Sequence, residues 1–211
     1  MSGMIAKMGW FIKEGHRQYT LSTFASAIQR RVSKNSIFSD ERELAMCSLD
    51  HSQKLELTLA VVGPQTVLDL GCGTGKSLDW FLAHGIDAWG VEGSALARDQ
   101  ALHPEVIQIA DLNQPLKLTR HFDLLWCVEV VEHIHPKYID VLMETLTCHA
   151  DRVVLTAAHP GQGGAGHFNE QPASYWIERF TAKEFSVDQE LTEALKALDE
   201  TFAENALAFS R

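Results

Sequence analysis

Nine residues combine bare backbone with a carboxylate in a way that suits a nucleotide-sized ligand. Residues 67–75 read Val-Leu-Asp-Leu-Gly-Cys-Gly-Thr-Gly, so three glycines alternate directly after an apolar run. Glycine has no Cβ, which lets the main chain adopt positive φ and lets a ligand approach it closely. Asp69 precedes the turn, and the helix expected at 77–84 would aim its first N–H groups at the same place. The spacing predicts a strand, a ligand-binding turn and a helix start.

The spacing of the glycines separates the possible ligands. A triphosphate-binding loop needs a glycine five residues before Gly75, but this position is Leu70, and Gly71 comes one residue too late. The dinucleotide fingerprint needs a third glycine where this chain has Lys76, which argues less strongly against NAD. Neither phosphate-binding pattern is complete.

Residues 67–75 resemble motif I of the class I S-adenosylmethionine (SAM) dependent methyltransferases. The resemblance implies that the glycine turn lies against the methionine part of SAM and that Asp69 helps to place the cofactor's amino-acid end. The turn residues expected to contact SAM are Gly71, Cys72, Gly73 and Gly75. A strand that merely ends in a glycine turn is the alternative, and it leaves the position of Asp69 unexplained.

The composition is that of an ordinary globular chain of 211 residues with a net charge of −10. Residues 1–39 hold six Lys/Arg and one acid, a net of +5, whereas residues 40–211 hold twelve and twenty-seven, a net of −15. An acidic body disfavours nucleic acid as a partner, although the basic arm could touch RNA or a phosphorylated small molecule. We expect a cytoplasmic protein without a membrane segment. The four cysteines are scattered, and the sequence has neither a secretory signal nor a long apolar run.

The apolar periodicity divides the chain into two parts. Helix-like spacing at 16–33 and 40–62 predicts an N-terminal helical cap over residues 1–60. From residue 66 strands alternate with helices, which predicts an α/β domain over 61–211 with a Rossmann-like, mostly parallel sheet covered on both faces. The expected strands are 66–70, 88–91, 106–109, 122–128 and 152–156, followed by a tail at 184–210. The methyltransferase resemblance implies seven strands, the last one antiparallel at 206–209.

Carboxylates stand at the ends of four successive expected strands. Ligands of such sheets bind where the carboxyl ends of the strands meet, so these acids should converge. They are Asp69, Glu92, Asp111 and Glu129. Glu92 lies where a carboxylate can accept both ribose hydroxyl protons.

The methyltransferase resemblance extends to three further short motifs. Glu92-Gly93-Ser94 matches the methyltransferase motif whose acid binds the ribose, and Asp111-Leu112 resembles the pair of residues that contacts the adenine. Residues 122–134 resemble the fourth-strand motif, so the backbone around Val128 and Glu129 would face the cofactor, and His133 would point toward the transferred methyl group.

A hydroxyl acceptor must lose a proton, and a histidine with a pKa near neutrality suits that role. The candidates are His133, His135, His159 and His167. We rank His133 and His167 first as catalytic residues, because the loops after the fourth and fifth strands border the place where an acceptor would enter. The glycine-rich loop at 161–166 could be a lid or a purely structural loop.

Binding of a metal ion is an alternative to the role of a catalytic base for the same region of the sequence. Glu129, Glu132 and His133 have the spacing i, i+3 and i+4 and could join His167 in a two-glutamate, two-histidine site for Mg²⁺ or Mn²⁺. That arrangement resembles the small-RNA 3′-terminal 2′-O-methyltransferases. Hard cations prefer more oxygen ligands, and the sequence after the fifth strand lacks that family's pattern, so our prediction includes no metal.

These observations predict a SAM-dependent methyltransferase that O-methylates a small polar metabolite, such as a sugar, a phenol or a natural-product intermediate. N-methylation stays open, because an amine needs less help from a base. The alternatives are a metal-dependent RNA 2′-O-methyltransferase and a non-catalytic SAM-binding regulatory protein. We expect a monomer or homodimer.

Overall fold

The computed structural model describes residues 50–198 and 200–211. The helix predicted at 16–33 and the start of the one predicted at 40–62 lie outside these residues. The end of the second prediction corresponds to α4 (Ser52–Val62), which terminates at Gly63 in the left-handed conformation. The division at residue 60 and the cap itself stay predictions. None of the helices in the described ranges is both long and apolar enough to cross a membrane.

The described residues form a seven-stranded sheet with the order β3-β2-β1-β4-β5-β7-β6. β1 to β5 are parallel to their neighbours, and β7 runs antiparallel to both β5 and β6. The chain order reverses between β1 and β4, and this is the switch point at which parallel sheets bind ligands. The strands are β1 (Thr66–Leu70), β2 (Asp87–Glu92), β3 (Ile107–Ile109), β4 (Leu124–Cys127), β5 (Arg152–Thr156), β6 (Ser186–Val187) and β7 (Ala206–Ser210).

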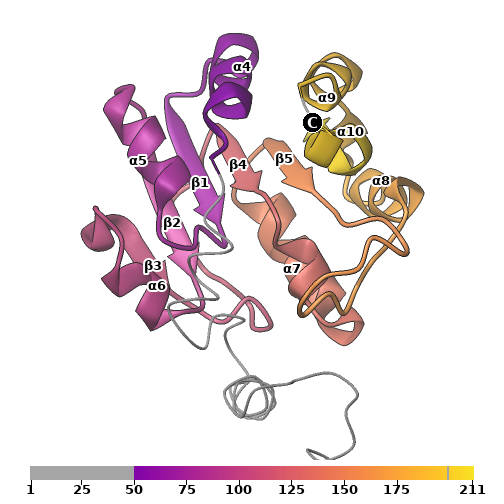
Figure 1. Cartoon of the computed structure of the whole chain (residues 1–211), viewed down its shortest axis with the longest axis horizontal. Coiled ribbons are helices and arrows are strands. Elements are labelled where there is room, and N and C mark those ends of the chain that lie inside the picture. Colours follow the sequence, from indigo (N-terminus) through magenta and orange to yellow (C-terminus); the bar gives the residue numbers. More distant parts are fainter. Residues whose placement is uncertain (1–49, 199) are drawn as a thin grey trace, which may run out of the picture. The chain divides into compact units, whose positions relative to one another are not determined.

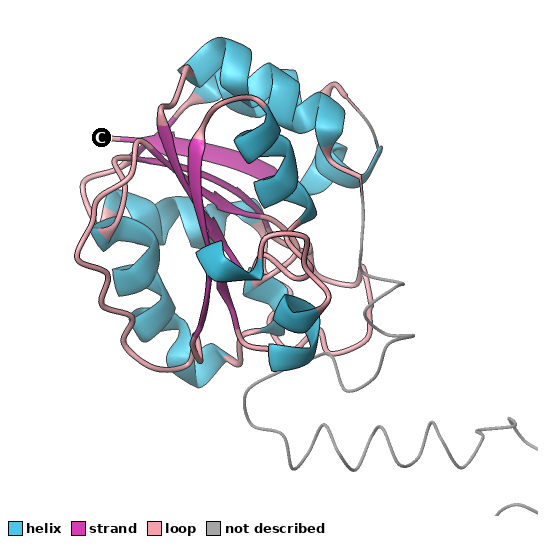
Figure 2. Cartoon of the chain, turned by 90° about the vertical axis from the view of Figure 1, so that its left-hand side faces the viewer, coloured by secondary structure: helices cyan, strands magenta, loops and turns pink. Residues whose placement is uncertain are grey.

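Helices cover both faces of this sheet, as Figures 1 and 2 show. Alternate strand residues point to opposite faces, so Leu68 and Leu125 join the apolar cluster under α7 and α8, whereas Val67 and Trp126 join the cluster under α4, α5 and α9. The remaining helices are α5 (Lys76–Ala83), α6 (Ala95–Asp99), α7 (Ile139–Cys148), α8 (Ala173–Thr181), α9 (Gln189–Lys196) and α10 (Glu200–Asn205). The predicted fold class, a mostly parallel sheet between helical layers, is confirmed.

The fourth strand is shorter than the predicted 122–128. Phe122 makes only an isolated bridge with Ala150 before the strand begins. At the other end Glu129 has a φ of 58°, which turns the chain out of the sheet and into a 3₁₀ turn, η2 (Val131–His133). This turn leaves the carboxyl edge of the sheet and starts one half of the candidate site.

Candidate active site

The glycine turn after β1 is shaped by positive φ values and by close packing. Gly71, Gly73 and Gly75 have φ angles of 77°, 56° and 79°. A Cβ on Gly71 would lie 2.5 Å from Cγ2 of Val130, so only glycine allows the turn to pack against the segment that follows β4. Gly75 is also the residue from which α5 begins. The sequence-predicted turn is therefore present, and it touches the other half of the site.

Gly90 supports the same turn, although the sequence analysis did not select it. A Cβ on Gly90 would lie 2.5 Å from Cδ1 of Leu78 and 2.7 Å from Sγ of Cys72. The bare backbone of β2 lets α5 and the turn pack directly on the strand. The signal was a glycine inside an otherwise apolar strand, which marks a close approach.

Asp69 is a buried carboxylate without a complete set of partners. It is 4% exposed, and its Oδ2 atom has no hydrogen-bond partner among the described residues. Burial, and secondarily the charge of Glu92, raise the pKa of Asp69 to about 8. A buried acid with an unsatisfied oxygen at the start of a ligand-binding turn favours a cationic group as its partner.

Glu92 organises the other side of the turn. Its Oε2 accepts a hydrogen bond from the Gly73 N–H at 2.8 Å, and its Oε1 accepts one from the Ser94 N–H at 2.7 Å. Burial raises the pKa of Glu92, while hydrogen bonds from Ser94, Gly73 and Gly93 lower it. Each carboxylate oxygen keeps a second lone pair, which can accept from a ribose hydroxyl.

The predicted adenine-binding pair lies beyond β3. Oδ1 of Asp111 accepts hydrogen bonds from the backbone N–H and the side-chain amide of Asn113, at 2.9 and 2.8 Å. Leu112 is buried in the larger apolar cluster. Val128, after β4, packs its side chain against the other cluster. Asp111 and Leu112 therefore follow the carboxyl end of β3, and Val128 follows that of β4, at the same edge of the sheet.

The backbone of Glu129 is held in its left-handed conformation by Thr156, the last residue of β5. The Glu129 N–H donates to Oγ1 of Thr156 at 2.8 Å, and this hydroxyl donates back to Oε1 of Glu129 at 2.8 Å. A non-glycine residue with positive φ is strained, and such residues gather at functional sites. Thr156 was not singled out from the sequence, where it reads as an ordinary strand residue.

Three of the four residues weighed as metal ligands come together. One potential ligand atom from each of Glu132, His133 and His167 lies within 4.8 Å of the others. The rings of the two histidines meet edge to face, with their centroids 5.0 Å apart. The carboxylate of Glu129 accepts from Thr156 instead. Burial, and then the charge of Glu129, raise the pKa of Glu132 to about 8.

The loop after β5 is fastened to this cluster. The backbone N–H groups of Phe168 and Asn169 donate to the Glu132 carbonyl at 2.9 and 3.1 Å. Glu170 accepts from the N–H groups of Gly161 and Gly163 at 2.9 and 2.7 Å, which closes the glycine-rich part of the loop on itself. These bonds support the structural interpretation of the loop, with His167 held in place by it.

The other two histidine candidates lie elsewhere. His135 is exposed, and its Nδ1 accepts from the Lys137 N–H at the start of a 3₁₀ turn, η3 (Pro136–Tyr138). Nε2 of His159 lies 2.9 Å from Oε2 of Glu204. The structure thus brings His133 and His167 together, and neither of the others joins them.

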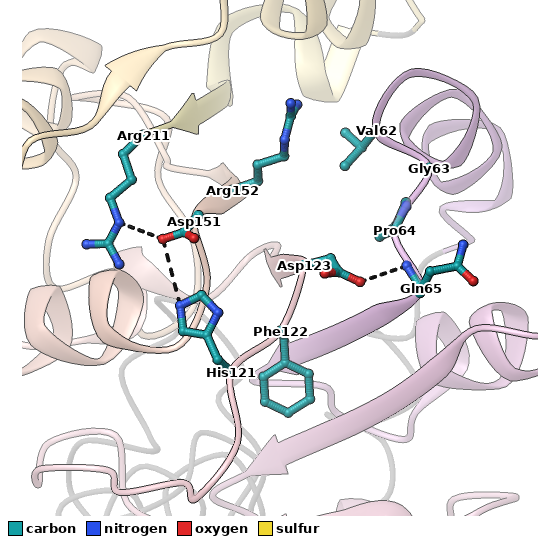
Figure 3. A pocket seen from close by; sticks show the side chains of 10 residues that line it. All are labelled: Val62, Gly63, Pro64, Gln65, His121, Phe122, Asp123, Asp151, Arg152 and Arg211. Atoms are coloured by element: carbon teal, nitrogen blue, oxygen red, sulfur yellow. Dashed lines mark hydrogen bonds and ion pairs between the residues drawn. The ribbon is translucent and has the colours of Figure 1, made fainter.

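A separate cavity of about 390 Å³ lies at the amino ends of the strands. Figure 3 shows its polar lining paired within the protein: Asp151 with Arg211 and His121, and Asp123 with the Gln65 N–H. Its lining residues lie before β1 and β4, at the start of β5 and after the antiparallel β7, whereas the glycine turn follows β1. This cavity is therefore distinct from the candidate site.

A family model described as a methyltransferase domain matches residues 22–199. The chain belongs to this methyltransferase family. The resemblance to class I SAM-dependent methyltransferases is thereby confirmed, and SAM is the methyl donor of such enzymes. No curated protein matches the chain at a significant level.

Solved structures with the same fold include three methyltransferases of different kinds. The sugar N-methyltransferase KedS8 from Streptoalloteichus sp. ATCC 53650 is 17% identical, with a TM-score of 0.66 over 82% of this chain and 94% of that chain. The methyltransferase domain of bacterial CtHen1 is 17% identical, with a TM-score of 0.57 over 76% and 97%. The magnesium protoporphyrin IX methyltransferase ChlM from Synechocystis PCC 6803, solved with bound SAM, is 19% identical, with a TM-score of 0.56 over 95% and 87%. At these identities the likeness shows the fold.

The residues at the carboxyl edge fit SAM. Oδ2 of Asp69 is a buried oxygen without a partner among the described residues, which suits a cationic amino-acid end, and the Glu92 carboxylate keeps lone pairs that suit ribose hydroxyls. The turn at Gly71 has no room for a side chain. No lysine or serine of a phosphate loop is required, because SAM has no phosphate.

Proposed function

We propose that this methyltransferase transfers the methyl group of SAM to a hydroxyl oxygen of a small polar acceptor bound beside Glu132, His133 and His167. The supporting observation is the contact between Gly71 and Val130, because it joins the glycine turn to the segment that carries Glu132 and His133. Cofactor and acceptor would then meet at the switch point between β1 and β4.

On the cofactor side we assign binding roles to the residues predicted from the sequence. Asp69 pairs with the amino-acid end of SAM, and Glu92 accepts from the ribose hydroxyls. The glycine turn and the Val128–Glu129 backbone line the methionine part, and Asp111 with Leu112 faces the adenine. When bound, SAM supplies an electrophilic methyl group, so the protein has to align the acceptor and manage one proton.

On the acceptor side the two histidines have defined tautomers. Nδ1 of His133 lies 3.1 Å from the Gly166 carbonyl oxygen, and Nδ1 of His167 lies 3.2 Å from Oε1 of Glu170. A carbonyl and a carboxylate only accept, so Nδ1 carries the proton in each neutral ring and the lone pair is on Nε2. A nitrogen lone pair is what an acceptor hydroxyl needs to donate its proton.

The local chemistry favours a small polar acceptor. The cluster contains a buried carboxylate and two imidazoles, and Phe168, 61% exposed, offers an aromatic surface in the same loop. RNA is the competing acceptor, and the basic segment that would bind it lies outside the described residues. A monomer or homodimer and a cytoplasmic location stay predictions.

Incubation with methyl-labelled SAM and a metabolite extract tests the proposal. We expect the label on oxygen of a small molecule, and His167→Ala should remove the transfer while His135→Ala, an exposed histidine near the same turn, retains it. Label on RNA whose binding weakens steeply with salt would support the RNA alternative. Tight SAM binding without methylation of any acceptor would support the regulatory alternative.

A further inference from the structure

The Glu132–His133–His167 cluster has the donor set of a transition-metal site. The two imidazoles and one carboxylate come from two loops, with His167 lying 34 residues after His133, and one ligand atom of each residue lies within 4.8 Å of the others. Such three-residue sets with open positions bind Fe²⁺, Mn²⁺ and Zn²⁺. The convergence is held by the backbone bonds from Phe168 and Asn169 to Glu132.

Glu132 provides the second, independent observation. It is completely buried, and neither of its carboxylate oxygens has a hydrogen-bond partner among the described residues. Burying a carboxylate without a partner is costly, and native proteins resolve it by pairing the group with a cation or a hydrogen-bond donor.

The surroundings of the histidines match those of metal ligands. Histidines that bind metals donate their other ring N–H to a carbonyl or carboxylate, which fixes the tautomer and the ring orientation. His133 has the Gly166 carbonyl in this position, and His167 has Glu170. Glu170 is itself oriented by the N–H groups of Gly161 and Gly163. The glycine-rich loop therefore acts as an outer support for His167.

We propose that Glu132, His133 and His167 bind one divalent transition-metal cation, of which Mn²⁺ and Zn²⁺ are the probes. The objection that hard cations need more oxygen ligands applies to Mg²⁺ and Ca²⁺, which two imidazoles do not suit. The carboxylate of Glu129, whose charge acts on Glu132, adds negative charge beside the cation.

The role of the cation rests on the proposed function. Its open positions would bind the acceptor hydroxyl and lower the pKa of that hydroxyl, so that the histidines act as ligands instead of as bases. The hydroxyl proton then passes to solvent water, the new bond forms between oxygen and the methyl carbon, and the carbon–sulfur bond breaks with its electron pair left on sulfur. An acceptor with two neighbouring hydroxyls could occupy two positions.

Metal binding is measured on full-length protein that has been stripped with EDTA and desalted. Mn²⁺ is titrated by electron paramagnetic resonance and Zn²⁺ by calorimetry, with Mg²⁺ for comparison. We expect one Mn²⁺ per chain, with Mg²⁺ binding at least about 10-fold more weakly. Glu132→Gln and His167→Ala should each weaken Mn²⁺ binding at least about 100-fold, and Glu170→Gln about 10- to 100-fold. His135→Ala is the matched control and should bind as wild type does.

S-adenosylhomocysteine binding, measured on each variant, shows that it is folded. The proposal is overturned if wild type binds S-adenosylhomocysteine but neither Mn²⁺ nor Zn²⁺, or if Glu132→Gln and His167→Ala bind the cation as tightly as wild type. Methyl transfer at full rate in EDTA overturns the metal role and leaves the proposed function standing. Stoichiometric Mn²⁺ binding that depends on Glu132, without transfer to any acceptor, supports the site and contradicts the proposed function.

Discussion

The protonation of Asp69 makes SAM binding depend on pH in a calculable way. With its pKa at about 8, Asp69 is about nine-tenths protonated at pH 7, and so is the α-amino group of free SAM, with a pKa near 7.8. If the bound state is an ion pair between the Asp69 carboxylate and that ammonium group, it holds one of these protons. Wild type should therefore release about 0.8 proton per SAM at pH 7.

Calorimetry in buffers of different ionisation enthalpy measures this proton directly, and Asp69→Asn is the perturbation. The variant has no acid to ionise, so its proton release at pH 7 should fall to about zero, with weaker binding. The other titratable groups that interact with Asp69 are Glu92 and the thiols of Cys72 and Cys127, and all three are present in both proteins. Burial raises the pKa of each thiol well above its usual value. Equal proton release by wild type and variant would refute the assigned role of Asp69.

Three further predictions concern stability and geometry. Because the folded-state pKa of Asp69 is raised, its contribution to apoprotein stability is complete below about pH 3.8 and is lost as the pH rises toward 8. In urea unfolding, the free energy of unfolding of wild type should fall by about 1 kcal/mol per pH unit between pH 5 and 7, relative to that of Asp69→Asn. Parallel pH dependences of the two proteins would contradict this. Gly71→Ala places a Cβ 2.5 Å from Cγ2 of Val130, in addition to the strain of a positive φ. It should therefore cost at least about 2 kcal/mol more than Gly85→Ala, because Gly85 also has a positive φ, 76°, but no atom lies within 4 Å of its Cβ. Equal costs by thermal denaturation would show that the close contact is relieved. Thr156→Val removes both hydrogen bonds to Glu129 and should lower the methyl-transfer rate about 10- to 100-fold. Thr156→Ser keeps the hydroxyl and should keep most of the rate. A Thr156→Val rate similar to that of wild type would show that Thr156 does not support the site.

The residues of the proposed cofactor half could be located from the sequence because their signals are local. A glycine turn, the acid before it and acids at strand ends lie close in sequence to the strands that position them, and the parallel sheet brings these ends together. Asp69 and Glu92 could thus be placed before the structure was known. The alternation of apolar residues likewise predicts the strands, because successive side chains of a strand point to opposite faces of the sheet.

The acceptor half depended on contacts that no local pattern encodes. Thr156 reaches Glu129 across neighbouring strands, and Glu170 supports His167 only because the loop folds back on its own glycines. The early end of β4 was also missed, because the apolar run continues to residue 128 while the backbone turns at Glu129. The convergence of His133 with His167 was predicted only in part, through the rule that loops after neighbouring strands share one edge.

A crystal structure with S-adenosylhomocysteine tests the central claim most directly, that the edge beyond β1, β2 and β4 is the active site. The account predicts the ribose hydroxyls on Glu92, the amino group on Asp69 and the sulfur on the side of the segment that carries Glu132 and His133. Density for the ligand in the cavity lined by Asp151 and Arg211, or at the glycine turn with the sulfur facing away from that segment, would contradict it.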